Sequence, residues 1–550
     1  MTVSAMRPYA LLILLTLAAL LPGIAALPPV DRDEPRYMQA SRQMVDSGDY
    51  VDIRFQDVSR YKKPIGIYWL QSAVVKASGM GADAPAWVYR LVSVFAGIVS
   101  VCAIFAIGRS LFGERAGWIA GIALAGIFGL AFEGRIAKTD ATLLAAALFA
   151  QGALAHIYVS SRQARTPSRA AFWLFWIAQG AALLIKGPII LLMSLLTILA
   201  LGVFGRHWRW LRALKSLPGV AIMALIAAPW IIAISLKVGW SFWQESVGRD
   251  MLGKAVSGQE SHGFPPGYYF LTYSLMLWPF GAMALQGGLA ALNRFRTDPR
   301  LAFMLAWYIP WWIFCEILPT KLPHYMLPAY PALLLLMAWW LESGGGTPAP
   351  AWQRWFAHAA RFGVALVGIG LAAIAVGLPI WFGQFSAWGL LGAAALLAAG
   401  WLGLGLAPGW PPLRRVAATT IASLVGIGLL VAKVLPSVDQ VWPAREIART
   451  YKAVAPCAES RLVSAGFGEP SLVFLTKADT LFTNGADAAQ NLLQNRCNVA
   501  AIAASQRDAF QAVFAQSPQK PVEVGRVESL NFSKGSAVAI TLYRLPQGGE

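Results

Sequence analysis

Long apolar segments constrain this chain more than any other feature of its sequence. About thirteen of them are long enough to cross a bilayer, which takes roughly 20 residues per helix. They lie near residues 8–27, 87–108, 116–133, 139–159, 170–184, 188–204, 217–236, 267–290, 301–317, 325–341, 362–382, 387–407 and 416–435. Backbone polar groups must be satisfied inside the hydrocarbon layer, so such a chain is expected to fold as an α-helical polytopic membrane protein.

The composition excludes the main alternatives to a membrane protein. Hydrophobic residues make up 57% of the chain and charged residues only 13%, against about 25% charged in soluble domains. Disordered chains and coiled coils also need far more charge. Lys and Arg total 45 against 27 Asp and Glu, a net charge of +18. In a soluble protein this excess would suggest nucleic acid, but here the placement of the cations explains much of it.

The cations gather in alternate loops. If the N-terminus is cytoplasmic, the Arg-rich loops all face the cytoplasm, as the positive-inside rule predicts. These loops are 109–115, 160–169, 205–216, 291–300, 342–361 and 408–415. The first apolar segment follows Arg7 and ends in small residues, like a secretory signal. Its apolar run is longer than a usual signal core, so we expect a retained helix.

The opposite side carries the larger hydrophilic segments. Loop 28–86 is predicted to contain an amphipathic helix over 33–46 and an interfacial helix over 64–79. A second long outer loop spans 237–266. Residues 436–550 alternate short apolar runs with helical stretches and predict a small C-terminal α/β domain, following a membrane domain over 1–435. Cys457 and Cys497 in this tail can pair if it faces an oxidising compartment.

Unusual polar residues from several loops fall at this outer face, which suggests one shared site. Asp31, Asp33 and Glu34 directly follow the first apolar segment. One of them can act as a general base for an acceptor group. Alternatively, Asp33 caps a helix and Glu34 occupies its first turn, where the helix dipole favours acids.

Several cations have two interpretations. Lys62 and Lys63 can bind a phosphate or attract anionic headgroups. Lys186 can snorkel to the membrane edge, or the Gly187-Pro188 helix start that follows it can help bind an anion. In one tight outer turn, Lys321 and Tyr325 can donate to phosphoryl oxygens or serve as membrane anchors. Another such turn holds Arg135, Lys138 and Asp140, where the alternative to a site is a structural Arg–Asp pair. His262 can ligate a metal with Glu260, or be simply solvated.

Nucleotide-binding motifs are missing from the sequence. It has no Gly-rich phosphate loop, Walker sequence or Rossmann fingerprint. An outward-facing enzyme also lacks access to cytosolic nucleotides. A donor that reaches the site through the membrane, such as a lipid-linked phosphosugar, explains why the outer face carries both cations and carboxylates.

Several motifs together resemble the bacterial lipid-carrier-dependent glycosyltransferases of the GT-C superfamily, and the aminoarabinose lipid A transferases among them. The resemblance covers about the first 340 residues and is much weaker in the tail. It rests on Asp33-Glu34-Pro35-Arg36-Tyr37, Ser41-Arg42-Gln43-Met44, Ser47-Gly48-Asp49, Tyr61-Lys62-Lys63-Pro64, Tyr68-Trp69, Asp140, Lys186-Gly187 and Lys321-Leu322-Pro323-His324-Tyr325. The implied fold is a GT-C transmembrane core with interfacial helices and a periplasmic C-terminal domain.

The resemblance implies roles for individual residues. Asp33 takes the position of the family's essential first-loop aspartate, and Asp140 that of a second important acid. Both are our catalytic candidates. The candidates for binding the lipid phosphate or the sugar are Arg36, Tyr37, Tyr61, Lys62, Lys63, Lys186, Lys321 and Tyr325. Where this chain has Lys62-Lys63-Pro64, the aminoarabinose transferases usually have Glu-Lys-Pro, which weakens both a metal role at this position and the assignment of aminoarabinose as donor sugar.

We therefore expect an inner-membrane glycosyltransferase whose active site and C-terminal domain face the periplasm. It would move a sugar from a polyprenyl-phosphate carrier to lipid A or another lipopolysaccharide component. The alternatives are transfer to a protein or another envelope glycan, and transport of a polyprenyl lipid. No cofactor is expected to be required; a divalent metal bound by His262 is the alternative. No nucleic-acid partner is expected.

Overall fold

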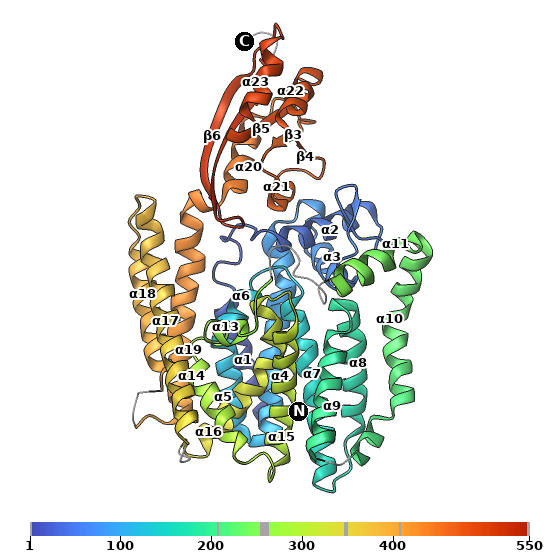
Figure 1. Cartoon of the computed structure of the whole chain (residues 1–550), viewed down its shortest axis with the longest axis vertical. Helices are drawn as coiled ribbons and strands as arrows, with labels where there is room; N and C mark the ends of the chain where they lie inside the picture. The colour runs from blue at the N-terminus through green and yellow to red at the C-terminus, as the bar shows by residue number, and fades with distance from the viewer. Residues whose placement is uncertain (1–2, 206–207, 254–262, 346–349, 406–408, 547–550) are drawn as a thin grey trace.

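The computed structural model describes residues 3–205, 208–253, 263–345, 350–405 and 409–546. A bundle of helices runs along the long axis of the molecule, and a small α/β domain stands on one end of it (Figure 1). The helices of the bundle are α1 (Val3–Leu20), α4 (Ala86–Phe112), α5 (Glu114–Gly126), α6 (Phe128–Glu133), α7 (Asp140–Arg162), α8 (Arg169–Lys186), α9 (Ile189–Gly205), α10 (Ser216–Val238), α13 (Tyr268–Met276), α14 (Gly281–Leu292), α15 (Pro299–Ile317), α16 (Tyr330–Glu342), α17 (Ala351–Trp381), α18 (Ala387–Gly403) and α19 (Pro412–Leu429).

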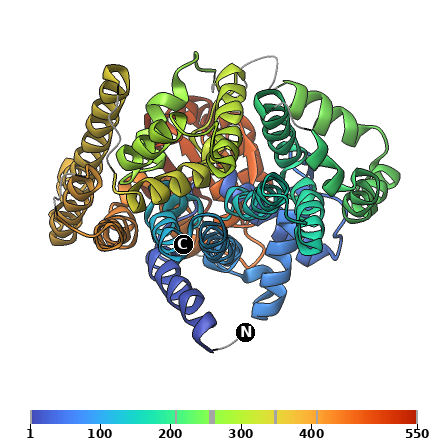
Figure 2. The same cartoon turned by 90° about the horizontal axis from the view of Figure 1, so that it is seen from below.

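Five helical segments are long and apolar enough to cross a membrane: Ala86–Phe112, Asp140–Arg162, Ser216–Val238, Ala351–Trp381 and Pro412–Ser437. They differ in how far the protein covers them. The apolar stretch of α7 is 83% buried inside the molecule, whereas that of α10 is only 22% buried. Figure 2 shows α7 within the bundle and α10 and α18 at its two edges. Large apolar side chains of these edge helices, such as Leu225 and Leu236, are therefore placed to face lipid.

Two predicted segments differ from single continuous helices. The segment over 116–133 is divided at Ile127, whose extended backbone separates α5 from α6. The segment over 267–290 is divided between α13 and α14, where Pro279 follows Trp278. The two breaks meet, because the Phe128 amide donates to the Trp278 carbonyl at 2.8 Å. An amide at one helix break thus donates its hydrogen bond to a carbonyl at the other break, so both polar groups are satisfied inside the protein.

Glycine permits close helix packing in the bundle. A Cβ atom on Gly108 of α4 would lie only 2.8 Å from the Cα atom of Gly117 in α5. Any larger residue at this crossing would force the two helices apart. The main apolar core surrounds this crossing, with Phe105, Leu124 and Leu144 fully buried.

The loop between α1 and α4 folds as a separate layer over one end of the bundle (Figure 1). The helices predicted at 33–46 and 64–79 are present as α2 (Asp33–Ser47) and α3 (Gly66–Ser78). Between them lies a hairpin of β1 (Arg54–Phe55) and β2 (Val58–Ser59). The layer also contains η1 (Gly81–Asp83). Short helical segments that follow in the chain are η2 (Arg209–Leu214), α11 (Ser241–Trp243), η3 (Gln244–Leu252), η4 (Pro323–Ala329), η5 (Leu430–Val434), η6 (Leu435–Ser437) and η7 (Asp439–Val441).

The C-terminal domain is built on a five-stranded mixed sheet in the order β4-β3-β5-β7-β6. β3 pairs in parallel with β4 and β5, whereas β7 is antiparallel to β5 and β6. Its elements are α20 (Pro443–Val454), β3 (Leu462–Ala465), α21 (Pro470–Leu475), β4 (Leu481–Thr483), α22 (Gly485–Gln494), β5 (Val499–Ala503), η8 (Ala504–Gln506), α23 (Arg507–Ala515), β6 (Val522–Asn531) and β7 (Ser536–Arg544). Cys457 and Cys497 form a disulfide in this domain.

Candidate active site

Three neighbouring carboxylates at the start of α2 have three different environments. Asp31 accepts hydrogen bonds from the amide, at 2.9 Å, and the hydroxyl of Ser471 in the C-terminal domain. Asp33 faces a cavity between α2 and the bundle. Glu34 points into the protein, where its side chain is fully buried. The expected helix start at Asp33 is present, but the three acids serve separate parts of the molecule.

Glu34 anchors the site to the bundle. Its carboxylate accepts two hydrogen bonds from Arg90 of α4, at 2.7 and 2.9 Å. It also accepts from the backbone amides of Val30, at 2.7 Å, and Ala137, at 2.8 Å. Arg90 is fully buried too and donates its remaining protons to backbone carbonyls near the start of the first loop. Glu34 thereby ties α2 to the loop that precedes Asp140.

Asp33 lies among cations. Its Oδ1 atom is 3.7 Å from Arg36 Nη1 and 3.7 Å from Arg60 Nη2. Burial alone would raise the pKa of Asp33, but Lys138, Arg60, Arg36 and Lys63 outweigh it and lower the pKa to about 2. The side chain still keeps 48% of its surface accessible. Asp33 is therefore an ionised carboxylate that a ligand can reach.

Asp140, the first residue of α7, forms the second acidic centre. Its Oδ1 atom is 2.5 Å from the amine of Lys186, the last residue of α8. Gly187 follows in a left-handed conformation (φ 73°), which ends α8 and allows α9 to begin two residues later. The Asp140 carboxylate also lies 3.6 Å from the Lys138 amine and 3.7 Å from His324 Nε2.

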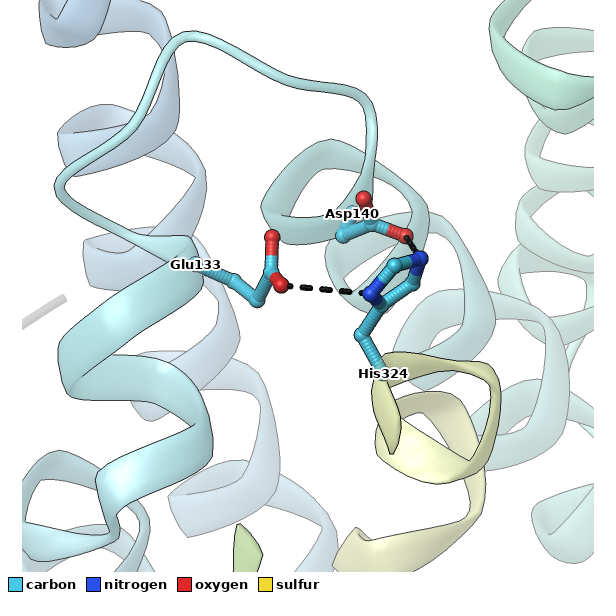
Figure 3. Close-up of side chains that lie close together, drawn as sticks. All are labelled: Glu133, Asp140 and His324. Carbon is cyan, nitrogen blue, oxygen red and sulfur yellow. Dashed lines mark ion pairs between the residues drawn. The ribbon is translucent and has the colours of Figure 1, made fainter. Parts of the chain in front are cut away.

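A second buried acid, Glu133, completes this group at the end of α6 (Figure 3). Its Oε1 atom is 3.4 Å from His324 Nδ1, and its Oε2 atom is 3.4 Å from the Lys138 amine. Glu133, Asp140 and His324 each offer a ligand atom within 4.8 Å of the others, the kind of grouping that can hold a metal ion. The sequence analysis did not assign a role to Glu133 or His324.

One cavity of about 650 Å³ brings Asp33 and Asp140 together. Seven of the predicted site residues line it: Asp33, Tyr37, Lys62, Lys63, Asp140, Lys186 and Tyr325. Arg60, Lys138 and His324 line it too. Other parts of the lining are apolar and come from α8, α9, α10, α11 and α15: Leu183, Leu184, Ile189, Leu192, Trp230, Ile231, Phe242, Trp243, Trp311 and Phe314. The cavity thus combines a charged wall with an apolar wall at the membrane.

Two residues that were predicted to bind substrate lie outside the cavity lining. Lys321 is 1% exposed, and its amine donates to the carbonyls of Phe264, at 2.9 Å, and Leu318. Tyr61 is 2% exposed, and its hydroxyl bonds Asp52 at 2.9 Å and Ser59 at 3.1 Å. Both side chains stabilise loops and lie outside the lining of this cavity, so their role in ligand binding stays a prediction. Residue type suggested phosphate binding, but backbone direction turns both groups inward.

The remaining predictions have mixed outcomes. Arg36 is not among the cavity-lining residues, but it reaches Asp33 from the next turn of α2. His262, the predicted metal ligand, lies outside the described residues. Arg60 was missed, although it directly precedes the Tyr61-Lys62-Lys63 motif and could have been included with it.

The C-terminal domain touches this site layer through α21. Arg42 of α2 donates to the Phe474 carbonyl at 2.9 Å, and its guanidinium lies 4.2 Å from the centre of the Phe474 ring. The Gln56 side chain donates to the carbonyls of Ala478 and Thr480. Together with the Asp31–Ser471 contact, these bonds seat the domain on the layer that carries Asp33.

Comparison with known proteins agrees with this architecture. A family model described as dolichyl-phosphate-mannose-protein mannosyltransferase matches residues 25–243. The crystal structure of ArnT from Cupriavidus metallidurans bound to undecaprenyl phosphate superposes with a TM-score of 0.76 over 98% of both chains, at 19% sequence identity. The chain resembles the aminoarabinose transferases and has their GT-C fold.

Sequence relatives of this GT-C chain carry the name undecaprenyl phosphate-alpha-4-amino-4-deoxy-L-arabinose arabinosyl transferase. The one from Proteus mirabilis is 26% identical over 309 residues, 56% of this chain and 54% of its own length. The one from Pseudomonas paraeruginosa is 28% identical over 422 residues, 73% of this chain and 71% of its own length. The chain thus spans about half the length of the first of these relatives and more of the second.

Proposed function

We propose that this GT-C chain is an integral membrane glycosyltransferase. It transfers a sugar from a polyprenyl-phosphate carrier to an acceptor at the periplasmic face of the bacterial inner membrane. The acceptor is lipid A or another lipopolysaccharide component. The names of the relatives support the donor class, and the resemblance seen in the sequence supports the acceptor class.

The composite cavity carries this proposal. A polyprenyl-phosphate sugar is apolar along its chain and anionic where the chain meets the sugar. The aromatic and aliphatic lining from α8 to α11 and α15 suits the chain. Arg60, Lys62, Lys63 and Lys186 line the same cavity and suit the phosphate.

The reaction we propose is a single displacement at the anomeric carbon. An acceptor oxygen forms the new bond to that carbon while the bond to the carrier phosphate oxygen breaks. The electron pair of the broken bond stays on the released polyprenyl phosphate. Cations already arranged around this position stabilise the growing charge without reorganising, which is the largest contribution in many transfer enzymes.

Asp33 is better suited to orientation than to proton removal. A general base works best with a pKa near the working pH, whereas the pKa of Asp33 is lowered to about 2 despite its burial, by Lys138, Arg60, Arg36 and Lys63. A phosphate acceptor, such as a lipid A phosphate, is already an anion and has no proton to lose. This favours a role for Asp33 in holding the sugar or a cationic partner over a role as base.

Two features support the periplasmic orientation. The Cys457–Cys497 disulfide is typical of an oxidising compartment. The Arg-rich loops belong to the opposite side by the positive-inside rule. The donor sugar is aminoarabinose or a related sugar; Lys62 in the cavity lining, where the aminoarabinose transferases usually have Glu, argues for testing anionic sugars too.

Asp33→Asn in a reconstituted assay tests the mechanism. With an undecaprenyl-phosphate sugar as donor, we expect the transfer rate to fall at least about 100-fold, as when a transition-state contact is removed. Asp57→Asn, at an exposed position of the β1–β2 hairpin, is the matched control and should keep its rate. Near-normal turnover by folded Asp33→Asn protein would remove Asp33 from the mechanism.

Mass spectrometry of envelope lipids from a deletion strain tests the overall proposal. Loss of one sugar mass from lipid A or core lipopolysaccharide, restored by the wild-type gene and not by Asp33→Asn, is the expected result. A sugar lost instead from a protein or another glycan would reassign the acceptor. Unchanged glycans with a mislocalised polyprenyl lipid would favour transport.

A further inference from the structure

The Lys138 amine lies beside a group of side chains that could hold a metal ion. Glu133, Asp140 and His324 converge as a metal site would require (Figure 3). The Lys138 amine lies 3.4 Å from Glu133 Oε2 and 3.6 Å from Asp140 Oδ2. It therefore contacts both acids of the group from within the cavity wall.

The charges of this cluster already balance. Two carboxylates, Glu133 and Asp140, face two ammonium groups, Lys138 and Lys186, and both acids are at most 3% exposed. A divalent cation would add an uncompensated charge of +2 to a buried site, which is strongly unfavourable. An ion could bind well only if an ammonium group left.

The backbone holds Lys138 in this place. The Lys138 amide donates to the Ile136 carbonyl at 2.9 Å, and the neighbouring Ala137 amide donates to Glu34 at 2.8 Å. The side chain is 13% exposed. The amine thereby bridges Glu133 and Asp140 through its two ion pairs.

We propose that Lys138 is a built-in replacement for a divalent cation, a positioning residue that orients Asp140 so that transfer proceeds without a metal. Removing its ammonium group should turn Glu133, Asp140 and His324 into a divalent-metal site. The part of this proposal that concerns transfer rests on the proposed glycosyltransferase activity. The part that concerns metal binding does not.

Metal binding is measured first, on purified full-length protein in detergent. After dialysis against Zn²⁺ and removal of free ion, we expect wild-type protein to retain far less than one equivalent and Lys138→Gln to retain about one. Co²⁺ added to Lys138→Gln should give the visible absorption of a protein-bound ion. Lys138→Gln/His324→Ala should lose both signals, which assigns them to this cluster.

Activity is the second measurement. Wild-type transfer should survive chelator, Lys138→Gln should fall at least about 100-fold, and Zn²⁺ or Mn²⁺ should restore part of that loss. Lys138→Arg, which keeps a cation, should stay chelator-resistant. Rescue by metal is a response that a merely structural role of Lys138 would not produce.

Several results would overturn the proposal. Wild-type protein that holds one equivalent of metal, lost on Glu133→Gln, would show that metal and Lys138 coexist. If the Lys138→Gln protein binds no metal, the Lys138 amine does not replace a metal ion. The same conclusion follows if this variant transfers sugar at a normal rate without metal. If Lys138→Gln does not fold, Lys138→Ala takes its place under the same criteria. If no variant or wild-type protein transfers sugar, the proposed function fails, while the metal measurements still judge Lys138.

Discussion

The two faces of α2 are held in opposite ways. Toward the bundle, Glu34 and Arg90 form a fully buried pair with every contact made to the protein interior. Toward the C-terminal domain, Asp31 and Arg42 make partly exposed contacts with α21. The inner face therefore fixes where Asp33 sits, and the outer face seats a domain that could move without dismantling the cavity. Four sets of substitutions test whether the two faces act independently.

Glu34→Ala should have the largest effect. The substitution leaves the fully buried Arg90 without its carboxylate partner. Breaking a buried pair in this way lowers the free energy of unfolding by about 3–5 kcal/mol. We expect a large fall in melting temperature in detergent and loss of transfer, because Asp33 and the Lys138 loop both lose their anchor. Glu528→Gln removes an exposed pair with Arg526 and should change little. Equal effects from the two variants would refute the anchoring role of Glu34.

Removing the disulfide should destabilise the outer region alone. The Cys457–Cys497 bond closes a sequence separation of 40 residues, and such bonds contribute about 2–4 kcal/mol. In Cys457→Ser/Cys497→Ser protein, amide hydrogen exchange should accelerate in β3 and β5 while α4 and α7 keep their protection. Cys102→Ser, at a free cysteine of α4, is the control. Exchange that rises equally in the bundle would mean that the two regions unfold as one.

Arg42→Ala should weaken the seat of the C-terminal domain more modestly. It removes a hydrogen bond from a charged group to the Phe474 carbonyl together with a cation–π contact, worth about 1–3 kcal/mol. We expect faster proteolysis between the bundle and α20, with the melting of the bundle unchanged. Arg42→Lys should recover only part of the contact. Proteolysis at the wild-type rate would show that α21 does not depend on Arg42.

Asp31 should make the seating of the C-terminal domain depend on pH. Burial raises its pKa to about 7, against the lowering by the Ser471 hydrogen bonds. The seated domain therefore binds a proton more readily than the released one, and seating should weaken as pH rises from about 4 to 7. Amide exchange in α21 measured across this range should show that trend, and Asp31→Asn should flatten it. A wild-type trend of the opposite sign would contradict the assignment.

Much of the site was predictable from two things: the residue types, and the side of the membrane on which their loops are expected to fall. Lys63, Lys186 and Asp140 are costly charges at the membrane edge, and such charges gather where a cavity can hold them. Glu34 was predicted only as a first-turn acid or a base, because nothing local shows that Arg90, 56 residues later, lies behind it. The inward direction of Lys321 and Tyr61 was missed for the same reason: a loop sequence does not show which way its side chains point.

By itself, the sequence determined the bundle, the interfacial helices and the separate C-terminal domain, because hydrophobic periodicity and charge distribution act locally. Tertiary structure alone decided where two long apolar segments break, which of three adjacent acids faces the cavity, and that Lys138 stands between Glu133 and Asp140. Those choices depend on the pairing of buried polar groups. Such pairing is set by partners far away in the chain, which no local pattern encodes.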